Sequence, residues 1–194
     1  MSMTNKYLNN VNKRYPQAVK SLSILLKEDF RMWKKIRNEN LVKTFFTRPE
    51  FRYLLYYRLM RSNLFLKILF LPTKLFNYHN LYITCQDIGG GLFLEYAFST
   101  IITCKKMGQH CYVNQQVTIG WNGGGAPSIG SDVHIKAGAK VIGNIIIGDD
   151  VIIGANAVVT KNVPAHSVVV GCPGRIIKTR ESIYDSWKKS DIKL

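Results

Sequence analysis

Histidine is the side chain of this 194-residue sequence best suited to proton transfer near neutral pH. There are four: His79, His110, His134 and His166. A positioned histidine can take the proton of an attacking hydroxyl group as a general base. A solvated or hydrogen-bonded surface histidine is the alternative in each case, so the elements that would position these side chains decide between the two.

The cysteines carry no metal or redox motif. Cys85, Cys104, Cys111 and Cys172 include no C-x-x-C pair. The chain opens with no signal peptide, because asparagines at positions 5, 9 and 10 interrupt any apolar core. We therefore expect reduced, mostly buried thiols in a cytosolic protein, and no bound metal.

Aliphatic residues return every six positions in the second half of the chain. The clearest run is Ile129, Ile135, Val141, Ile147, Ile153 and Val159. A period of six fits neither an α-helix nor a simple strand. It predicts short strands joined by corners, three of which close one coil of a parallel β-helix in about 18 residues. Ordinary buried strands are the alternative, but they would show period-two alternation and hairpin turns.

One segment interrupts the repeat. Ten residues, not six, separate Ile119 from Ile129, and the extra four belong to residues 121–128. We expect these residues to form a loop extruded from the β-helix, where function tends to sit.

The hexad register also places the candidate side chains. The row that contains Leu94 passes through Val113, Ile135 and Ile153, and its third positions stack as Tyr96, Gln115, Ala137 and Ala155. On the same register His110 stacks with Asp132 and Asp150 on a different face. His134 ends its hexad at a corner, and His166 lies beyond the regular repeat.

The positive charge is concentrated before the repeat. The chain has a net charge of +15, of which +12 falls on residues 1–80, with 16 basic and four acidic side chains. This charge indicates an anionic partner. No nucleic-acid module is present, and residues 89–91 and 123–125 do not continue as the G-K-[ST] of a phosphate loop.

Residues 17–36 and 45–71 read as helices. They could cap the open end of the β-helix, and their basic and aromatic residues could also meet an anionic membrane surface. We therefore divide the chain into a helical basic segment (1–80), a β-helix (81–178) and a C-terminal tail (179–194).

Five strings in the repeat resemble the hexapeptide-repeat acyltransferases, and are similar to serine acetyltransferases and to O-acetyltransferases of surface-polysaccharide pathways. The strings are residues 88–94, 115–120, 137–143, 158–164 and 170–177. Residues 45–61, which include the string 48–52, resemble the helical lead-in of short bacterial members. The resemblance implies a mainly-β fold, a left-handed parallel β-helix after an α-helical segment. It also implies a homotrimer that transfers acetyl from acetyl-CoA to a hydroxyl of a sugar, a polysaccharide intermediate or L-serine.

The resemblance places the family's catalytic base at Tyr96, where the relatives carry histidine. In serine acetyltransferases a carboxylate orients this base, and its position corresponds here to Leu81. Those enzymes also carry a second histidine, but the extruded loop of this chain has none. His110 or His134 of a neighbouring subunit could replace the base. The resemblance implies two sets of acetyl-CoA contacts: small residues for the pantetheine arm, Ala137 and Ala155, and polar or basic residues for the phosphates, Thr160, Lys161, Arg175 and Lys178. Because a phenol is a weak base, a catalytically degenerate binding or scaffold subunit is the alternative function.

Overall fold

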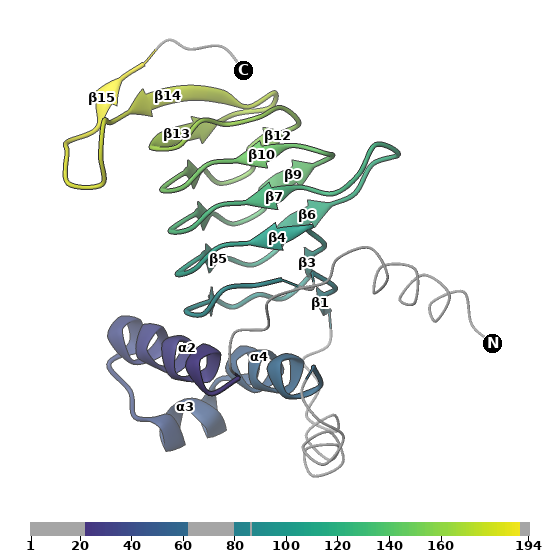
Figure 1. Ribbon diagram of the computed structural model, residues 1–194, viewed down its shortest axis with the longest axis vertical. Coiled ribbons are helices and arrows are strands. Elements are labelled where there is room, and N and C mark those ends of the chain that lie inside the picture. Colours follow the sequence, from purple (N-terminus) through teal and green to yellow (C-terminus); the bar gives the residue numbers. More distant parts are fainter. Residues whose placement is uncertain (1–21, 62–79, 86, 191–194) are drawn as a thin grey trace.

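A computed structural model describes residues 22–61, 80–85 and 87–190 of the chain. His79 and the outer parts of the two predicted helices, residues 17–21 and 62–71, lie outside these residues. The described chain forms a small group of helices at one end of a tall stack of β-coils (Figure 1).

The helical segment holds three described helices, α2 (Leu22–Arg37), α3 (Leu41–Thr47) and α4 (Pro49–Leu59). The prediction of one helix from residue 45 to 71 is therefore wrong. Arg48 is extended, with φ −116° and ψ 95°, because the proline that follows it disfavours the helical region. The break therefore separates α3 from α4.

The strands of the described chain build three sheets that wind around one core. Their orders are β1-β3-β6-β9-β12, β10-β7-β4 and β15-β14-β13-β11-β8-β5-β2. The strands are β1 (Leu81–Ile83), β2 (Phe93–Leu94), β3 (Thr100–Ile102), β4 (Lys106–Met107), β5 (Tyr112–Val113), β6 (Thr118–Gly120), β7 (Ser128–Ile129), β8 (His134–Ile135), β9 (Lys140–Ile142), β10 (Ile146–Ile147), β11 (Ile152–Ile153), β12 (Val158–Val159), β13 (Ser167–Val170), β14 (Arg175–Thr179) and β15 (Lys188–Lys189).

The hexad residues fill the inside of this stack. Leu94 pairs with Val113, Val113 with Ile135 and Ile135 with Ile153, all in parallel register, and none of these side chains is exposed. Each row of the repeat therefore becomes a column of the core. The predicted fold class, a left-handed parallel β-helix preceded by helices, is confirmed.

The helices cover the open end of the first coil, as the capping hypothesis predicted (Figure 1). The indole N–H of Trp33 donates to the carbonyl of Leu92 at 3.0 Å, and its ring lies 4.6 Å from the ring of Phe93. A fully buried tryptophan from α2 thus seals the first strand of the seven-stranded sheet.

An ion pair from two helices completes this cap. Arg58 of α4 donates to Asp29 of α2 at 2.9 and 3.2 Å, and both side chains are almost fully buried. The pair also satisfies four backbone groups of the first coil, the N–H groups of Gly91 and Leu92 and the carbonyls of Ile88 and Gly89. Polar edges that would otherwise lack partners are thereby paired.

Two cysteines differ from the expectation of reduced thiols. Cys85 and Cys104 form a disulfide that joins the ends of β1 and β3. Parallel neighbours in the stack bring these two side chains together, which their spacing in the sequence does not reveal. Cys111 is a buried free thiol, and Cys172 is exposed.

Candidate active site

The corner that holds Tyr96 is longer than the corners above it. Glu95 and Asn114 occupy equivalent places, because their N–H groups bond to Val113 and Ile135 in the next coil. The next equivalent residue is Phe98, whose carbonyl accepts from Gln116 as that of Gln115 accepts from Gly138. Phe98, not Tyr96, therefore stacks below Gln115, which corrects the predicted column.

Two extra residues, Tyr96 and Ala97, thus bulge from the first coil. Tyr96 lies in the left-handed region, with φ 58°, and its side chain is 52% exposed. Ala97 is fully buried and anchors the bulge. The bulge presents the Tyr96 side chain outside the column, where a substrate could reach it.

Glu95 is held by three side chains beside Tyr96. The Tyr112 hydroxyl donates to Oε2, the Asn114 amide donates to the same oxygen at 3.1 Å, and the Arg37 guanidinium lies 3.4 Å from Oε1. Burial and the bond to this carboxylate raise the pKa of Tyr112. Tyr112 is therefore a neutral donor. The carboxylate of Glu95 is already bound by side chains of its own chain.

Two arginines from the helical segment lie near the Tyr96 side chain. The guanidinium of Arg37 lies 5.5 Å from the Tyr96 ring centre and 5.4 Å from that of Phe93. The pKa of Arg48 is raised, chiefly by its hydrogen bond to Glu39, with a further contribution from Tyr96. The helical cap therefore brings two arginines near the candidate base, each of them paired with a carboxylate, Arg37 with Glu95 and Arg48 with Glu39.

His110 lies at another corner of the coil. Its Nδ1 is 3.7 Å from Asp132 and its Nε2 is 3.7 Å from Glu28. His110, Asp132 and Asp150 share a φ of 53–55°, so the predicted stacking of these three residues is confirmed. His166 continues this column, and its Nδ1 lies 2.8 Å from Asp150. The residues of this column come just before strands of the seven-stranded sheet, whereas Tyr96 comes after the end of β2 in the same sheet. The length of the strand, about 13 Å, therefore separates the column from the Tyr96 corner.

His134 is a strand residue rather than a corner residue, contrary to the prediction. It lies in β8, and its ring stacks on that of Tyr112 at 5.2 Å, with an angle of 9° between the planes. Burial lowers the pKa of His134, and the charge of Lys136 lowers it further. At pH 7 the imidazole is therefore neutral and can accept a proton, on the same sheet face as Tyr112.

Ala137 and Ala155 share the edge of the β-helix that carries the Tyr96 corner. The N–H of Asn156 bonds to the carbonyl of Ala137, which sets the two alanines one above the other. Gly138 has φ 74°, and a β-carbon there would come within 2.0 Å of Asn156. Small residues keep this edge open above Phe98.

The opposite edge of the same sheet carries the extruded loop, which projects between β6 and β7 in Figure 1. Asn122 and Gly125 exchange two backbone hydrogen bonds that close its tip, and Trp121 is 57% exposed. The extruded loop is thus confirmed. Thr160 and Lys161 follow β12 on this edge, and both are exposed.

Arg175 and Lys178 lie in β14, which runs antiparallel to β13 at the C-terminal end of the stack. Both side chains are exposed, and Lys178 pairs in register with Lys189. The structure therefore places these two basic residues on the seven-stranded sheet, whereas Thr160 and Lys161 follow the last strand of the five-stranded sheet; all four belong to the upper coils. Tyr96 lies at the lowest coil.

Leu81, where the resemblance placed an orienting carboxylate, is a buried residue of β1. Sequence reasoning missed the contacts of Glu95 with Arg37, Tyr112 and Asn114. The spacing of Tyr112 could have revealed one of them, because it precedes Val113, the partner of Leu94, and so lies beside Phe93. Nothing in the sequence places the end of α2 there.

No group of three or more His, Cys, Asp or Glu side chains in the described ranges is arranged to hold a metal ion. The coil geometry defines a hexapeptide-repeat protein.

Comparison with known proteins agrees with this class. Residues 126–161 match the model "Bacterial transferase hexapeptide (six repeats)". The chain is 45% identical over 98 residues to a serine acetyltransferase of Staphylococcus xylosus, a match that covers 47% of this chain and 45% of that protein. A serine acetyltransferase of Synechococcus elongatus is 40% identical over 95 residues, which cover 46% of this chain and 39% of the relative.

Solved structures extend the similarity of fold to the helices. The serine acetyltransferase of Neisseria gonorrhoeae superposes with a TM-score of 0.64 and 23% identity, over 87% of this chain and 74% of that one. The soybean apoenzyme gives 0.63 and 24%, over 91% and 78%. The chain is similar in sequence to serine acetyltransferases and shares the fold of hexapeptide-repeat acyltransferases, although it spans less than half the length of the curated relatives it matches.

Proposed function

We propose that this protein is an O-acetyltransferase that uses acetyl-CoA and modifies a hydroxyl of a sugar or polysaccharide intermediate, or L-serine. One observation carries the proposal: Tyr96 projects from the bulged corner of the first coil, on the same edge of the β-helix as Ala137 and Ala155. This edge could take a narrow pantetheine arm, with its thioester toward Tyr96. One similar serine acetyltransferase was solved in a complex with CoA.

The reaction joins the acceptor oxygen to the acetyl carbon and breaks the carbon–sulfur bond of the thioester. The proton of the acceptor hydroxyl passes to the departing sulfur, so the products are the acetyl ester and the free thiol of CoA. Backbone N–H groups can stabilise the oxyanion that forms between these steps. Tyr96 orients the acceptor hydroxyl or donates to the oxyanion, because a neutral phenol accepts protons weakly.

The site needs a second copy of the chain. Tyr96 and the alanine edge lie on one side of the five-stranded sheet, and the loop with Thr160 and Lys161 lies on the other, about 20 Å across six extended residues. A homotrimer would bring the loop edge of one subunit to the alanine edge of the next. Lys161, Arg175 and Lys178 would then meet the phosphates of acetyl-CoA. His110 or His134 could also reach a neighbour's site.

The contacts of Glu95 favour a sugar hydroxyl over L-serine as acceptor. An amino acid brings an ammonium group, whose natural partner is a carboxylate. The carboxylate next to Tyr96 is already bound by Arg37, Tyr112 and Asn114. A related enzyme was solved in a complex with serine, so L-serine stays in the proposal as the second acceptor.

We place the protein in the cytoplasm, at the inner surface of the membrane, where polysaccharide intermediates bound to lipid would meet it. A catalytically degenerate scaffold subunit is the second candidate. It is favoured by the phenol at the position where the family carries its base.

The test measures free thiol released from acetyl-CoA with a panel of acceptors: L-serine, nucleotide sugars and short oligosaccharides. We expect release above the hydrolysis background with a sugar acceptor. Release with L-serine alone would show that this protein acetylates serine, as the names of its relatives indicate for them. Binding of acetyl-CoA without release on any acceptor would support the scaffold. Light scattering at micromolar concentration should give three chains, and a monomer would contradict the shared site.

A further inference from the structure

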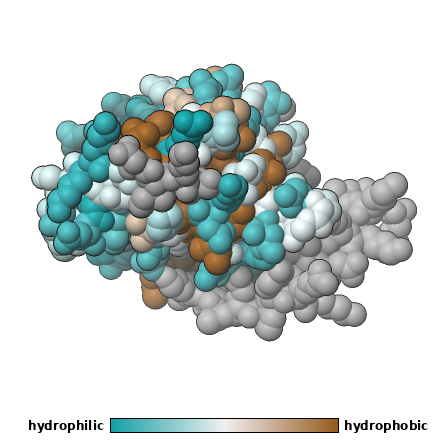
Figure 2. Space-filling view, turned by 90° about the horizontal axis from the view of Figure 1, so that it is seen from above, coloured by the Kyte–Doolittle hydropathy of each residue, from teal (hydrophilic) through white to brown (hydrophobic). Residues whose placement is uncertain are grey.

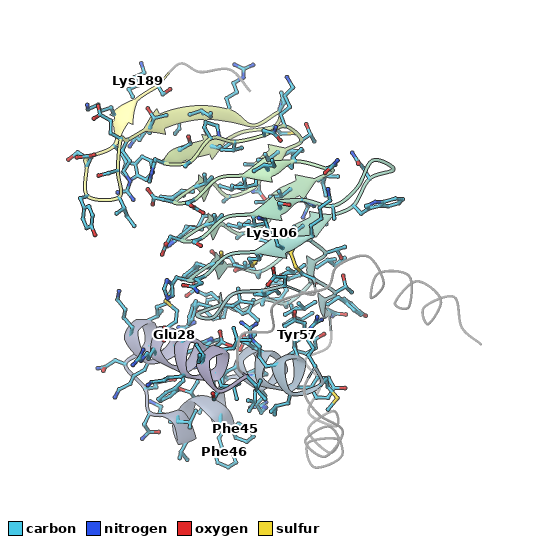
Figure 3. All side chains as sticks on the ribbon, in the orientation of Figure 1. Glu28, Phe45, Phe46, Tyr57, Lys106 and Lys189 are labelled. Carbon is cyan, nitrogen blue, oxygen red and sulfur yellow. A yellow bond between two sulfur atoms is a disulfide. The ribbon has the colours of Figure 1, made fainter. Side chains whose placement is uncertain are left out.

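The outer side of the helical cap carries an apolar groove of about 480 Å³. Leu26 and Phe30 of α2, Val42 and Phe46 of α3, and Phe51 and Leu55 of α4 line it. The groove faces away from the β-helix, and Phe45 and Phe46 lie at the far end of the molecule (Figure 3). This surface is separate from Tyr96 and from both edges of the sheet described above.

The apolar residues around this groove are unusually exposed. Phe46 is 74% exposed, Val42 66% and Leu41 48%, and all three line the groove. Val42 and Phe46 are four residues apart on α3, so they project from one face of that helix. Seen from the C-terminal end instead, hydrophilic side chains gather on the side of β15 (Figure 2).

Positive charge lies at the α2 side of the groove. Lys27 is its one charged lining residue among those described, and Lys34 lies on the same stripe of α2, four residues after Phe30. Residues 22–61 contain ten basic and four acidic side chains. Two of these acids, Asp29 and Glu50, are buried, and Glu39 is bound by Arg48. The exposed charge of the cap is therefore positive.

We propose that this groove and its rim dock the protein on an anionic phospholipid bilayer. Phe46 and Val42 enter the boundary between headgroups and acyl chains, the groove takes acyl-chain segments, and Lys27 and Lys34 meet lipid phosphates. Exposed aromatic and aliphatic residues with lysines beside them are what an interfacial membrane contact requires. No helix in residues 22–61, 80–85 and 87–190 has the length and apolar character to span a bilayer, so the contact is peripheral. It does not depend on the proposed reaction.

Vesicle flotation with the full chain tests this contact. We expect the chain to float with phosphatidylcholine vesicles that contain 30% phosphatidylglycerol and to bind pure phosphatidylcholine at least tenfold more weakly. Val42→Ser with Phe46→Ser should lower the partition coefficient at least tenfold, and Lys27→Gln or Lys34→Gln about fivefold each at low salt. The matched controls lie at the other end of the molecule: Tyr184→Ser, 95% exposed, and Lys189→Gln should change nothing.

A second measurement locates the inserted residue. In Phe46→Trp, fluorescence should be quenched by brominated lipids in anionic vesicles, whereas Tyr184→Trp should give no added quenching. Undiminished binding of the Val42→Ser, Phe46→Ser variant would overturn the proposal, as would equal binding to neutral and anionic vesicles. If that variant instead loses a subunit contact by light scattering while its vesicle binding is unchanged, the groove is an interface between copies. Acetyl transfer to a soluble acceptor should be the same in all these variants.

Discussion

The carboxylate of Asp29 and the guanidinium of Arg58 meet at 2.9 Å between two helices and the first β-coil, where neither side chain reaches solvent. Their shared role is to end the stack of coils, since each also bonds to backbone groups of the first coil. The pair thus fixes the helices on the β-helix and, through α2, sets Arg37 beside Glu95.

Arg58→Met should destabilise the protein by about 3–5 kcal/mol, because it leaves a buried carboxylate without its partner. Denaturant unfolding followed by circular dichroism measures the change. The exposed pair of Arg31 and Glu28 is the matched control, and Arg31→Met should cost less than about 1 kcal/mol. Equal losses for the two variants would contradict the capping role.

Asp150 should give the protein an acid-sensitive contribution to stability. Partial burial favours its neutral form, but bonds from Arg180 and His166 outweigh this effect and hold the pKa of Asp150 below its ordinary value. A lowered pKa stabilises the fold above pH 3.8, the ordinary value, and this contribution disappears as the pH falls through the folded-state pKa. Asp150→Asn should therefore cost about 2 kcal/mol at pH 7 and almost nothing near pH 2.

Urea unfolding of the wild type and Asp150→Asn from pH 7 to pH 2 measures this dependence. Glu181→Gln is the control, because its pair with Lys188 is exposed and should show no such trend. A pH-independent difference between the wild type and Asp150→Asn would contradict the assignment.

Thiol labelling should distinguish the four cysteines. Burial raises the pKa of Cys111 to about 12, so this thiol should resist iodoacetamide at pH 8 until the protein unfolds. Exposed Cys172 should be labelled in the native protein, and Cys85 and Cys104 only after reduction. Mass spectrometry of the labelled peptides reads the result. Native labelling of Cys85 or Cys104 without reductant would show that the pair is reduced, as the sequence suggested.

Tyr96→His should raise acetyl transfer at least about tenfold, because it supplies a base whose ordinary pKa is near neutral where the phenol is a weak one. Tyr96→Phe should lower the rate, since it removes the only polar atom of this side chain. Phe98→His, on the neighbouring residue in the stacked column, is the control and should not raise the rate. If neither Tyr96 variant changes the rate, Tyr96 is not the active position, and His110 or His134 becomes the candidate base.

The hexad pattern was sufficient to predict the β-helix, its core columns and the extruded loop, because each depends on spacing along one chain. The Tyr96 corner was assigned to the wrong column for the same reason: counting two positions past Leu94, as in the other coils, ignores Tyr96 and Ala97, which are two extra residues at this corner. The break at Arg48 was readable from Pro49, yet the apolar character on both sides favoured one helix.

Contacts between distant segments could not be predicted from these patterns. The end of α2 reaches Glu95 only because Trp33, Asp29 and Arg58 fix the helices on the first coil. The disulfide between Cys85 and Cys104 likewise depends on the register of β1 and β3. Such contacts follow from the packing of the finished fold rather than from a local period.

Calorimetric titration with acetyl-CoA tests the central claim most directly. The account predicts saturable binding of one acetyl-CoA per chain, and at least tenfold weaker binding by Ala155→Trp, which fills the edge above Tyr96. Ala165→Trp, an exposed alanine on another corner, should bind as the wild type does. An absence of binding by the wild type, or equal binding by both tryptophan variants, would contradict the proposed site.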